Sequence, residues 1–139
     1  TPIPSRPLPG RVSIVNIAGG AVVTQSLVLE GTYTEVTDEI LVLVYPTNGR
    51  WYLQSKYACV AQHTDKSGGV WKVPIVLGED ADAGLPFDIV VILADVPATR
   101  FFSDWQTRWC AGGKYPGFLT LDLPPGIAEK QRIRVIRSK

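Results

Sequence analysis

Glu39–Tyr45 reads EILVLVY, and this stretch decides the class of fold. Its side chains are apolar on both faces of an extended backbone, which is typical of a strand in the middle of a sheet. A proline and the turn residues 47–49 end it. Phe87–Asp95 has the same character, because both of its alternating faces are largely apolar. The two segments therefore predict two central strands.

Shorter apolar stretches, cut by Gly, Pro, Asn and Asp, surround these two segments. Several alternate between apolar and polar side chains, which predicts strands that are buried on one face. We expect these strands at Arg11–Ile17, Ala21–Gly31, Trp51–Tyr57, Val70–Leu77 and Gln131–Arg137. About seven short strands separated by turn signals predict an all-β fold, an antiparallel β-sandwich like an immunoglobulin domain.

Residues 97–110 break the pattern of alternation. Four aromatic residues recur there at steps of three and four, namely Phe101, Phe102, Trp105 and Trp109. Asp95 or Val96 precedes the segment, Pro97 suits a first helical turn, and Gly112 suits the end. We expect one helix at Pro97–Cys110 that lays its aromatic stripe over an end or an edge of the sandwich.

Length and composition exclude several classes of protein. A chain of 139 residues with 45% apolar and 19% charged residues forms one folded domain and is not a disordered tail. A net charge of +1 argues against nucleic acid as a partner. We see no apolar run long enough to span a membrane and no signal peptide. The absence of methionine indicates a piece of a longer or processed protein.

The first ten residues differ from the rest in composition. They hold Pro2, Pro4, Pro7 and Pro9, which favour an extended backbone. We therefore expect a proline-rich linker at residues 1–10 and the β-sandwich domain at residues 11–139.

Several of these stretches also carry a resemblance to a known family. The matching stretches are Ile40–Pro46 with Gly49–Tyr52, Gly69-Val70-Trp71 with Gly78, Gly84 and Phe87-Asp88-Ile89, and Ala94-Asp95 with Leu123–Gly126 and Arg132–Arg137. Together they resemble an uncharacterised bacterial immunoglobulin-like accessory domain, appended to signalling or protease-like proteins. The resemblance covers roughly residues 11–137 and implies a non-catalytic module. Leu53 and the cysteine pair depart from the pattern of that family.

We expect no enzyme, because the residues for catalysis are not grouped. His63 is the one histidine, and it lies in the polar stretch Gln62–Gly69 without a preorganised partner. The acidic residues are scattered, mostly in turns, so a glycosidase pair is not indicated. Neither a nucleophile elbow nor a glycine-rich phosphate loop occurs.

Metal ligands and cofactors are not indicated either. Cys59, His63 and Cys110 lack the paired spacing of a zinc site. The acidic stretch Glu79–Gly84 fits a solvated turn better than a calcium loop, since it lacks the EF-hand order of ligands. We expect no metal and no cofactor.

Cys59 and Cys110 are expected to form a disulfide, which would place the protein outside the cytoplasm or at the cell surface. The alternative is two buried thiols.

Aromatic side chains are the best indication of a binding function. The candidates are Trp51, Tyr52, Tyr57, Trp71 and Tyr115. Exposed rings could stack on a polysaccharide, which would make the chain a carbohydrate-binding module. However, Trp51, Tyr57 and Trp71 fall on the predicted inward faces, where they would pack in the core. Tyr52 and Tyr115 are expected to be more exposed.

The last strand is basic. It alternates arginine with isoleucine or valine, which places Arg132 and Arg134 on the solvent face. We interpret it as an edge strand kept soluble by charge, with a weak contact to an anionic surface as the alternative. The whole pattern predicts a non-catalytic interaction or spacer module with an unidentified protein partner.

Overall fold

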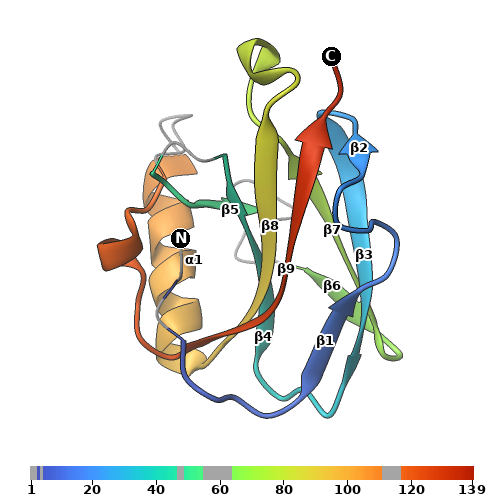
Figure 1. The fold of residues 1–139 in the computed structure, drawn as a ribbon. Helices are drawn as coiled ribbons and strands as arrows, with labels where there is room; N and C mark the ends of the chain where they lie inside the picture. Colours follow the sequence, from blue (N-terminus) through green and yellow to red (C-terminus); the bar gives the residue numbers. More distant parts are fainter. Residues whose placement is uncertain (1–2, 4, 47–48, 55–63, 111–116) are drawn as a thin grey trace.

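The chain folds as two β-sheets that pack face to face, with one helix on the outside of the second sheet (Figure 1). The computed structural model describes residues 3, 5–46, 49–54, 64–110 and 117–139. The first sheet contains, in order, β1 (Arg11–Ile14), β3 (Ser26–Thr34), β7 (Val70–Val76) and β6 (Asp65–Ser67). The second contains β2 (Val22–Val23), β9 (Ile127–Arg137), β8 (Pro86–Ala94), β4 (Glu39–Tyr45) and β5 (Tyr52–Gln54). The predicted β-rich sandwich is thus confirmed.

The two sheets enclose a core in which Trp71 is the largest side chain. Trp71 is fully buried, and its indole nitrogen donates a hydrogen bond to the carbonyl oxygen of Thr32 at 3.2 Å. The ring lies against β3 at Gly31, where a Cβ atom would collide with the indole of Trp71 and with the carbonyl oxygen of Ser13. Glycine at position 31 therefore lets β1, β3 and the indole approach one another closely.

A second core lies on the outer face of the second sheet, under helix α1 (Val96–Cys110). Both faces of β4 and β8 are buried, so the outer face of these strands also needs a cover. Ala98 and Phe102 of α1 supply it, together with Phe118 from the segment that follows the helix. The helix thus starts one residue before its expected beginning, and it covers a face of a sheet instead of the expected end or edge.

Asp95 caps the N-terminus of α1. Its Oδ1 atom accepts a hydrogen bond from the backbone N–H of Ala98 at 3.0 Å, which satisfies one of the free donors of the first turn. Its carboxylate also lies 3.4 Å from the guanidinium of Arg6. A Cβ atom at Gly126, where φ is +85°, would collide with this carboxylate, so the cap requires glycine there.

Several strands have other bounds than the sequence predicts. The expected strand Ala21–Gly31 is split, since β2 pairs in parallel with β9 of the second sheet whereas β3 stays in the first. β6 was not predicted, because its residues are polar and it is held to β7 by backbone pairing. β9 begins at Ile127 and not at Gln131. Nine strands are seen in the described residues, against the expected seven or so.

The expected linker is packed on the domain in its described part. Residues 3 and 5–10, here named the N-terminal strap, bury Ile3 and Leu8. The backbone N–H of Arg6 donates to the carbonyl of Ile127 at 2.8 Å, and Lys130 Nζ donates to the carbonyl of Leu8 at 2.7 Å. The strap therefore adds to the cores of the sandwich. No helix within the described residues is long and apolar enough to cross a bilayer.

Candidate functional site

A cluster of four charged side chains lies on the outer face of the second sheet, and we name it the Asp88 cluster. Its members are Asp88, Glu129, Arg132 and Arg134. Asp88 Oδ1 accepts a hydrogen bond from Arg134 Nε at 2.7 Å, and Oδ2 lies 3.3 Å from Arg134 Nη2. The same Oδ2 lies 3.6 Å from Arg132 Nη1. Arg132 Nη2 donates in turn to Glu129 Oε1 at 2.8 Å.

The register of β8 and β9 brings these side chains together. Asp88 is paired with Arg134, and Val90 with Arg132, so both arginines share the outer face with Asp88. Glu129 is three residues from Arg132 and would point to the opposite face in a regular strand. The register shifts next to Val91, where a β-bulge restores Glu129 to the outer face.

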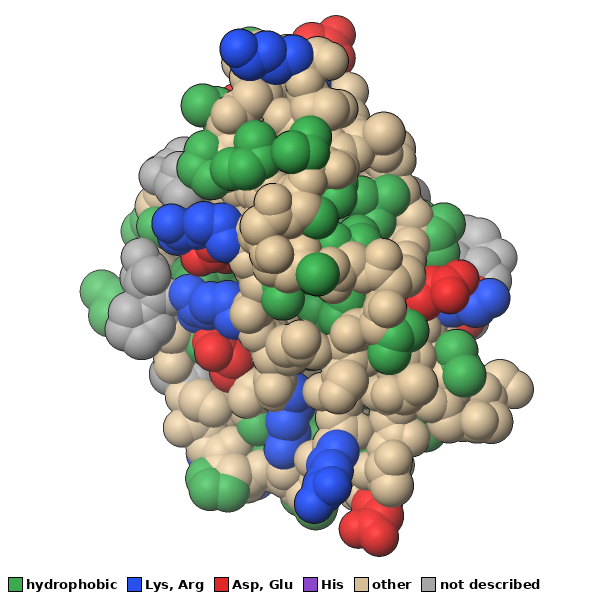
Figure 2. Space-filling model, turned by 45° about the vertical axis from the view of Figure 1, so that its right-hand side comes forward, with side chains coloured by type: hydrophobic (Ala, Val, Ile, Leu, Met, Phe, Trp, Pro, Cys, Tyr) green, Lys and Arg blue, Asp and Glu red, His purple; other side chains and the backbone are tan. Residues whose placement is uncertain are grey.

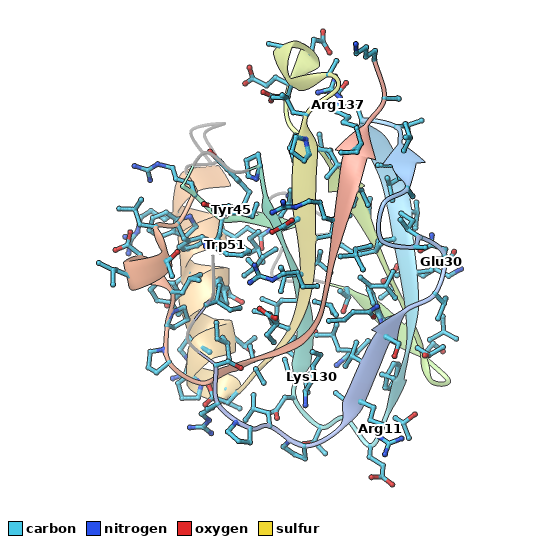
Figure 3. All side chains as sticks on the ribbon, in the orientation of Figure 1. Arg11, Glu30, Tyr45, Trp51, Lys130 and Arg137 are labelled. Carbon is cyan, nitrogen blue, oxygen red and sulfur yellow. The ribbon has the colours of Figure 1, made fainter. Side chains whose placement is uncertain are left out.

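Aromatic side chains support the cluster from one side. The guanidinium carbon of Arg132 lies 5.2 Å from the centre of the Trp51 ring, which is a cation–π geometry. Tyr45 packs on Trp51 with ring centres 4.5 Å apart (Figure 3). Trp51 Nε1 donates to Thr120 Oγ1 at 3.1 Å. Arg132 is therefore fixed between a carboxylate on each strand and a buried ring.

The exposure of the four side chains differs in a way that matters for binding. The Asp88 side chain is 4% exposed, whereas that of Arg134 is 61% exposed. The hydrogen bond from Arg134 to Asp88, and then the negative charge of Asp88, raise the pKa of Arg134 above its usual value. Arg134 therefore presents a permanent cation to solvent from an anchored position. On the face shown in Figure 2, basic and acidic side chains both occur, so no field of one sign covers it.

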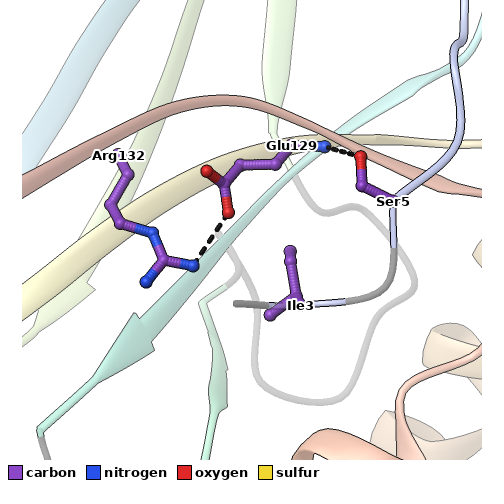
Figure 4. Close-up of a pocket in the computed structure, with 4 residues that line it drawn as sticks. All are labelled: Ile3, Ser5, Glu129 and Arg132. Atoms are coloured by element: carbon purple, nitrogen blue, oxygen red, sulfur yellow. Dashed lines mark hydrogen bonds and ion pairs between the residues drawn. The ribbon is translucent and has the colours of Figure 1, made fainter. Parts of the chain in front are cut away.

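A shallow, open pocket adjoins the cluster. Ile3 and Ser5 of the N-terminal strap line one side, and Glu129 and Arg132 line the other (Figure 4). Ser5 Oγ accepts a hydrogen bond from the backbone N–H of Glu129 at 3.0 Å, which fixes the strap beside β9. The pocket offers one apolar side chain, a carboxylate and a guanidinium, a set suited to binding a polar chain.

The aromatic candidates lie in different environments. Trp51 and Trp71 have no exposed surface, so neither can belong to a flat platform for a sugar ring. Both tryptophans are buried, as predicted. Trp71 lies between the sheets, on the predicted inward face, whereas Trp51 lies in the second core beneath α1, on the outer side of the second sheet. Tyr52 is half-buried on β5. Tyr57 and Tyr115 lie outside the described residues.

The other residues considered from sequence do not form a site in the described part of the chain. Cys59, His63 and the thiol of Cys110 lie outside it. No group of three potential metal ligands occurs among the described side chains. At the acidic stretch Glu79–Gly84, the guanidinium of Arg137 donates to the carbonyls of Leu77 and Glu79 (Figure 3). Calcium binding needs oxygen ligands, and these carbonyl oxygens already accept hydrogen bonds from Arg137. The positive charge of Arg137 would also repel a calcium ion at this place.

Sequence reasoning missed Asp88 and Glu129 as site residues. The signal for Asp88 was present, because an acidic residue inside the apolar run FDIVVILA requires a partner if it is buried. Arg132 and Arg134 were placed on the solvent face, and Arg134 is indeed exposed.

Comparison of the chain with protein-family models and with curated proteins gave no match. Function is therefore inferred from the chain's own residues and their contacts.

Proposed function

We propose that the chain is an immunoglobulin-like β-sandwich module without catalytic activity, and that it mediates a protein–protein contact. In this proposal it belongs to a larger bacterial signalling or surface protein and acts outside the cytoplasm or at the cell surface. The contact is assigned to the Asp88 cluster and the pocket beside it. The partner segment is an extended, acidic peptide that lies between Arg134 and the N-terminal strap.

The observation that carries this proposal is the anchored and exposed guanidinium of Arg134. Its Nε is held by Asp88 at 2.7 Å, yet 61% of its side chain is exposed. Arginine is enriched among the residues that dominate interface energies. A side chain that is already ordered loses less conformational entropy when a partner binds. Arg134 can therefore bind a carboxylate of a partner with only a small loss of side-chain conformational entropy.

The surrounding groups favour a binding role over a chemical one. The lone pairs of Asp88 are engaged by the guanidinium groups of Arg132 and Arg134, so this carboxylate is committed to pairing. The carboxylate of Asp95 is likewise engaged, because it accepts the hydrogen bond that caps α1. What remains accessible at the site is the guanidinium of Arg134, the partly exposed carboxylate of Glu129 and a shallow pocket with one apolar side chain, which are features of a recognition surface.

The test is selection of peptides on the purified chain. A phage-displayed library of random peptides is panned on the wild type, and enriched peptides are then measured against Arg134→Ala. The matched control is Arg11→Ala, which removes an exposed arginine from β1 of the other sheet (Figure 3). We expect acidic peptides whose affinity falls by at least about tenfold in Arg134→Ala and is unchanged in Arg11→Ala.

Two results would contradict the proposal. The first is a set of peptides that bind Arg134→Ala as tightly as the wild type. The second is a saturable change in tryptophan fluorescence on titration with polysaccharides that is lost in Tyr52→Ala. The latter would make the chain a carbohydrate-binding module.

A further inference from the structure

The outer face of the first sheet is apolar in part, and no element of the described chain covers it. Helix α1 covers the outer face of the second sheet, whereas every second residue of β7 is exposed on the first. The exposed apolar side chains of this face come from β3, from β7 and from the end of β1. They are Val15, Val28, Val70, Pro74 and Val76.

The register of the strands joins most of these side chains into one patch. Val28 on β3 lies directly opposite Pro74 on β7, and Val76 lies two residues further along β7. Val15 lies beside Glu30, because its backbone N–H donates to the carbonyl of Glu30 at 2.9 Å. Side chains that are directly opposite or diagonal on one face of a sheet contact each other. We name this group of residues the sheet patch: Val28, Glu30, Lys72, Pro74 and Val76.

A pair of opposite charges lies next to the apolar side chains of the patch. Glu30 is opposite Lys72 in the register of β3 and β7, two residues along each strand from Val28 and Pro74. Lys72 Nζ lies 3.5 Å from Glu30 Oε1, and the two side chains are 54% and 39% exposed. Glu30 points away from the second sheet (Figure 3). The patch therefore offers one cation and one anion, both accessible, beside an apolar surface.

The edges of the first sheet are less suited to a partner than this face. On one edge, the N–H of Ile14 on β1 donates to Gln131 Oε1 at 2.6 Å. On the other edge, beyond the short strand β6, Pro74 has no N–H, and the N–H of Val76 donates to Gln54 Oε1 at 2.9 Å. Addition of a strand needs free backbone groups at an edge. Association through the face is therefore favoured over association through the edges.

The charges of the sheet patch are arranged so that the patch matches a copy of itself. A two-fold axis that runs along the strands, between β3 and β7, exchanges these two strands in the facing copy. Each side chain then faces the residue that is its cross-strand neighbour in its own chain. Glu30 would therefore face Lys72 of the second copy, and Val28 would face Pro74. Each of these contacts occurs twice, because the axis is two-fold.

We propose that the sheet patch is the interface of a homodimer, in which the outer faces of two first sheets pack on each other about this axis. Sheets packed face to face keep their strand directions within about 30° of each other, so the arrangement is an ordinary one for sheets. Glu30 and Lys72 supply the match of charge, and the apolar side chains supply the contact that excludes water. The interface uses residues other than those of the Asp88 cluster, so either assignment can fail without the other.

The experiment is sedimentation of the full chain over a range of protein concentrations, in which the wild type should pass from monomer to dimer. Lys72→Glu places like charges opposite each other, so the dissociation constant should rise by at least about tenfold. Glu30→Lys should have the same effect. The double variant that carries both substitutions restores the opposite charges, so its dissociation constant should return toward that of the wild type. The control is Arg100→Glu, which changes the net charge as Lys72→Glu does but lies exposed on α1, and it should leave the association unchanged.

A further substitution tests the apolar part of the patch. Val28→Asp brings a carboxylate into the interface, so it should also raise the dissociation constant by at least about tenfold. Val22→Asp is its control, because Val22 is 68% exposed on β2 of the other sheet. The proposal is overturned if the wild type stays monomeric at every concentration, or if the double variant dissociates as readily as the single variants. It is also overturned if Val28→Asp dimerises as the wild type does.

Discussion

Gly31 provides a sharp test of how the sandwich core is packed. We consider the substitution Gly31→Ala, which adds one methyl group in the middle of β3. That methyl group would collide with the indole of Trp71 on one side and with the carbonyl oxygen of Ser13 on the other. One obstacle is a fully buried ring and the other is backbone of the paired strand β1, so neither can move away as a flexible surface side chain would.

The expected loss of stability follows from these contacts. Forcing an extra methyl group into a packed core costs about 1–3 kcal/mol. If the indole of Trp71 shifts, its hydrogen bond to Thr32 is also lost, which adds about 0.5–1.5 kcal/mol. The free energy of unfolding should therefore fall by about 1.5–4.5 kcal/mol. With a slope of about 2 kcal/mol per molar urea, the unfolding midpoint should drop by about 1–2 M.

Gly19→Ala is the matched control. A Cβ atom at Gly19 meets nothing within 4 Å, so this methyl group should change the stability by less than about 0.5 kcal/mol. Both substitutions restrict the unfolded chain in the same way, and comparison of the two removes that contribution. Urea unfolding followed by tryptophan fluorescence measures both variants. Equal midpoints for Gly31→Ala and Gly19→Ala would refute the close packing of Trp71 against β3.

Three further substitutions test the helix and its surroundings by urea unfolding. Asp95→Ala should cost about 1 kcal/mol through loss of the helix cap, whereas Asp95→Asn should stay near the wild type; equal losses would argue against the cap. Phe102→Ala should cost about 3–5 kcal/mol, because this fully buried ring joins α1 to the sheet, and a loss below about 1 kcal/mol would contradict that packing. Arg137→Met should cost about 1–3 kcal/mol, since the carbonyls of Leu77 and Glu79 lose their donor; an unchanged midpoint would show that water replaces it.

Much of the fold could be predicted from local patterns. Glu39–Tyr45 was predicted with the bounds that the structure has, because a two-sided apolar strand ended by proline is a strong signal. The helix was predicted to within one residue, since its aromatic residues recur at helical spacing. Its place over a face was missed, although the apolar outer side of β8 already indicated that something must cover it. β6 could not be predicted, because its polar residues lack the alternation of apolar and polar side chains that indicates a strand, and only backbone pairing holds it to β7.

The candidate site was harder to predict for a physical reason. Asp88 and Arg134 are 46 residues apart, and they meet only because of the register between β8 and β9. The outer face is reached by Glu129 only because of a β-bulge, and no residue in that stretch predicts a bulge. Sequence reasoning placed the arginines on the surface but could not give them partners. Periodicity therefore predicts which face a side chain occupies, and pairing across strands decides what it touches.

The two-sided burial of β4 and β8 has a consequence for the motions of the molecule. Each strand contributes side chains to the core between the sheets and also to the core beneath α1. Neither core can open without exposing the strands that the other core needs, so both should be lost in one cooperative event. The amide protons of β4 and β8 should then exchange with solvent deuterium only through global unfolding. Those of the exposed edge strand β6 should exchange through far smaller openings.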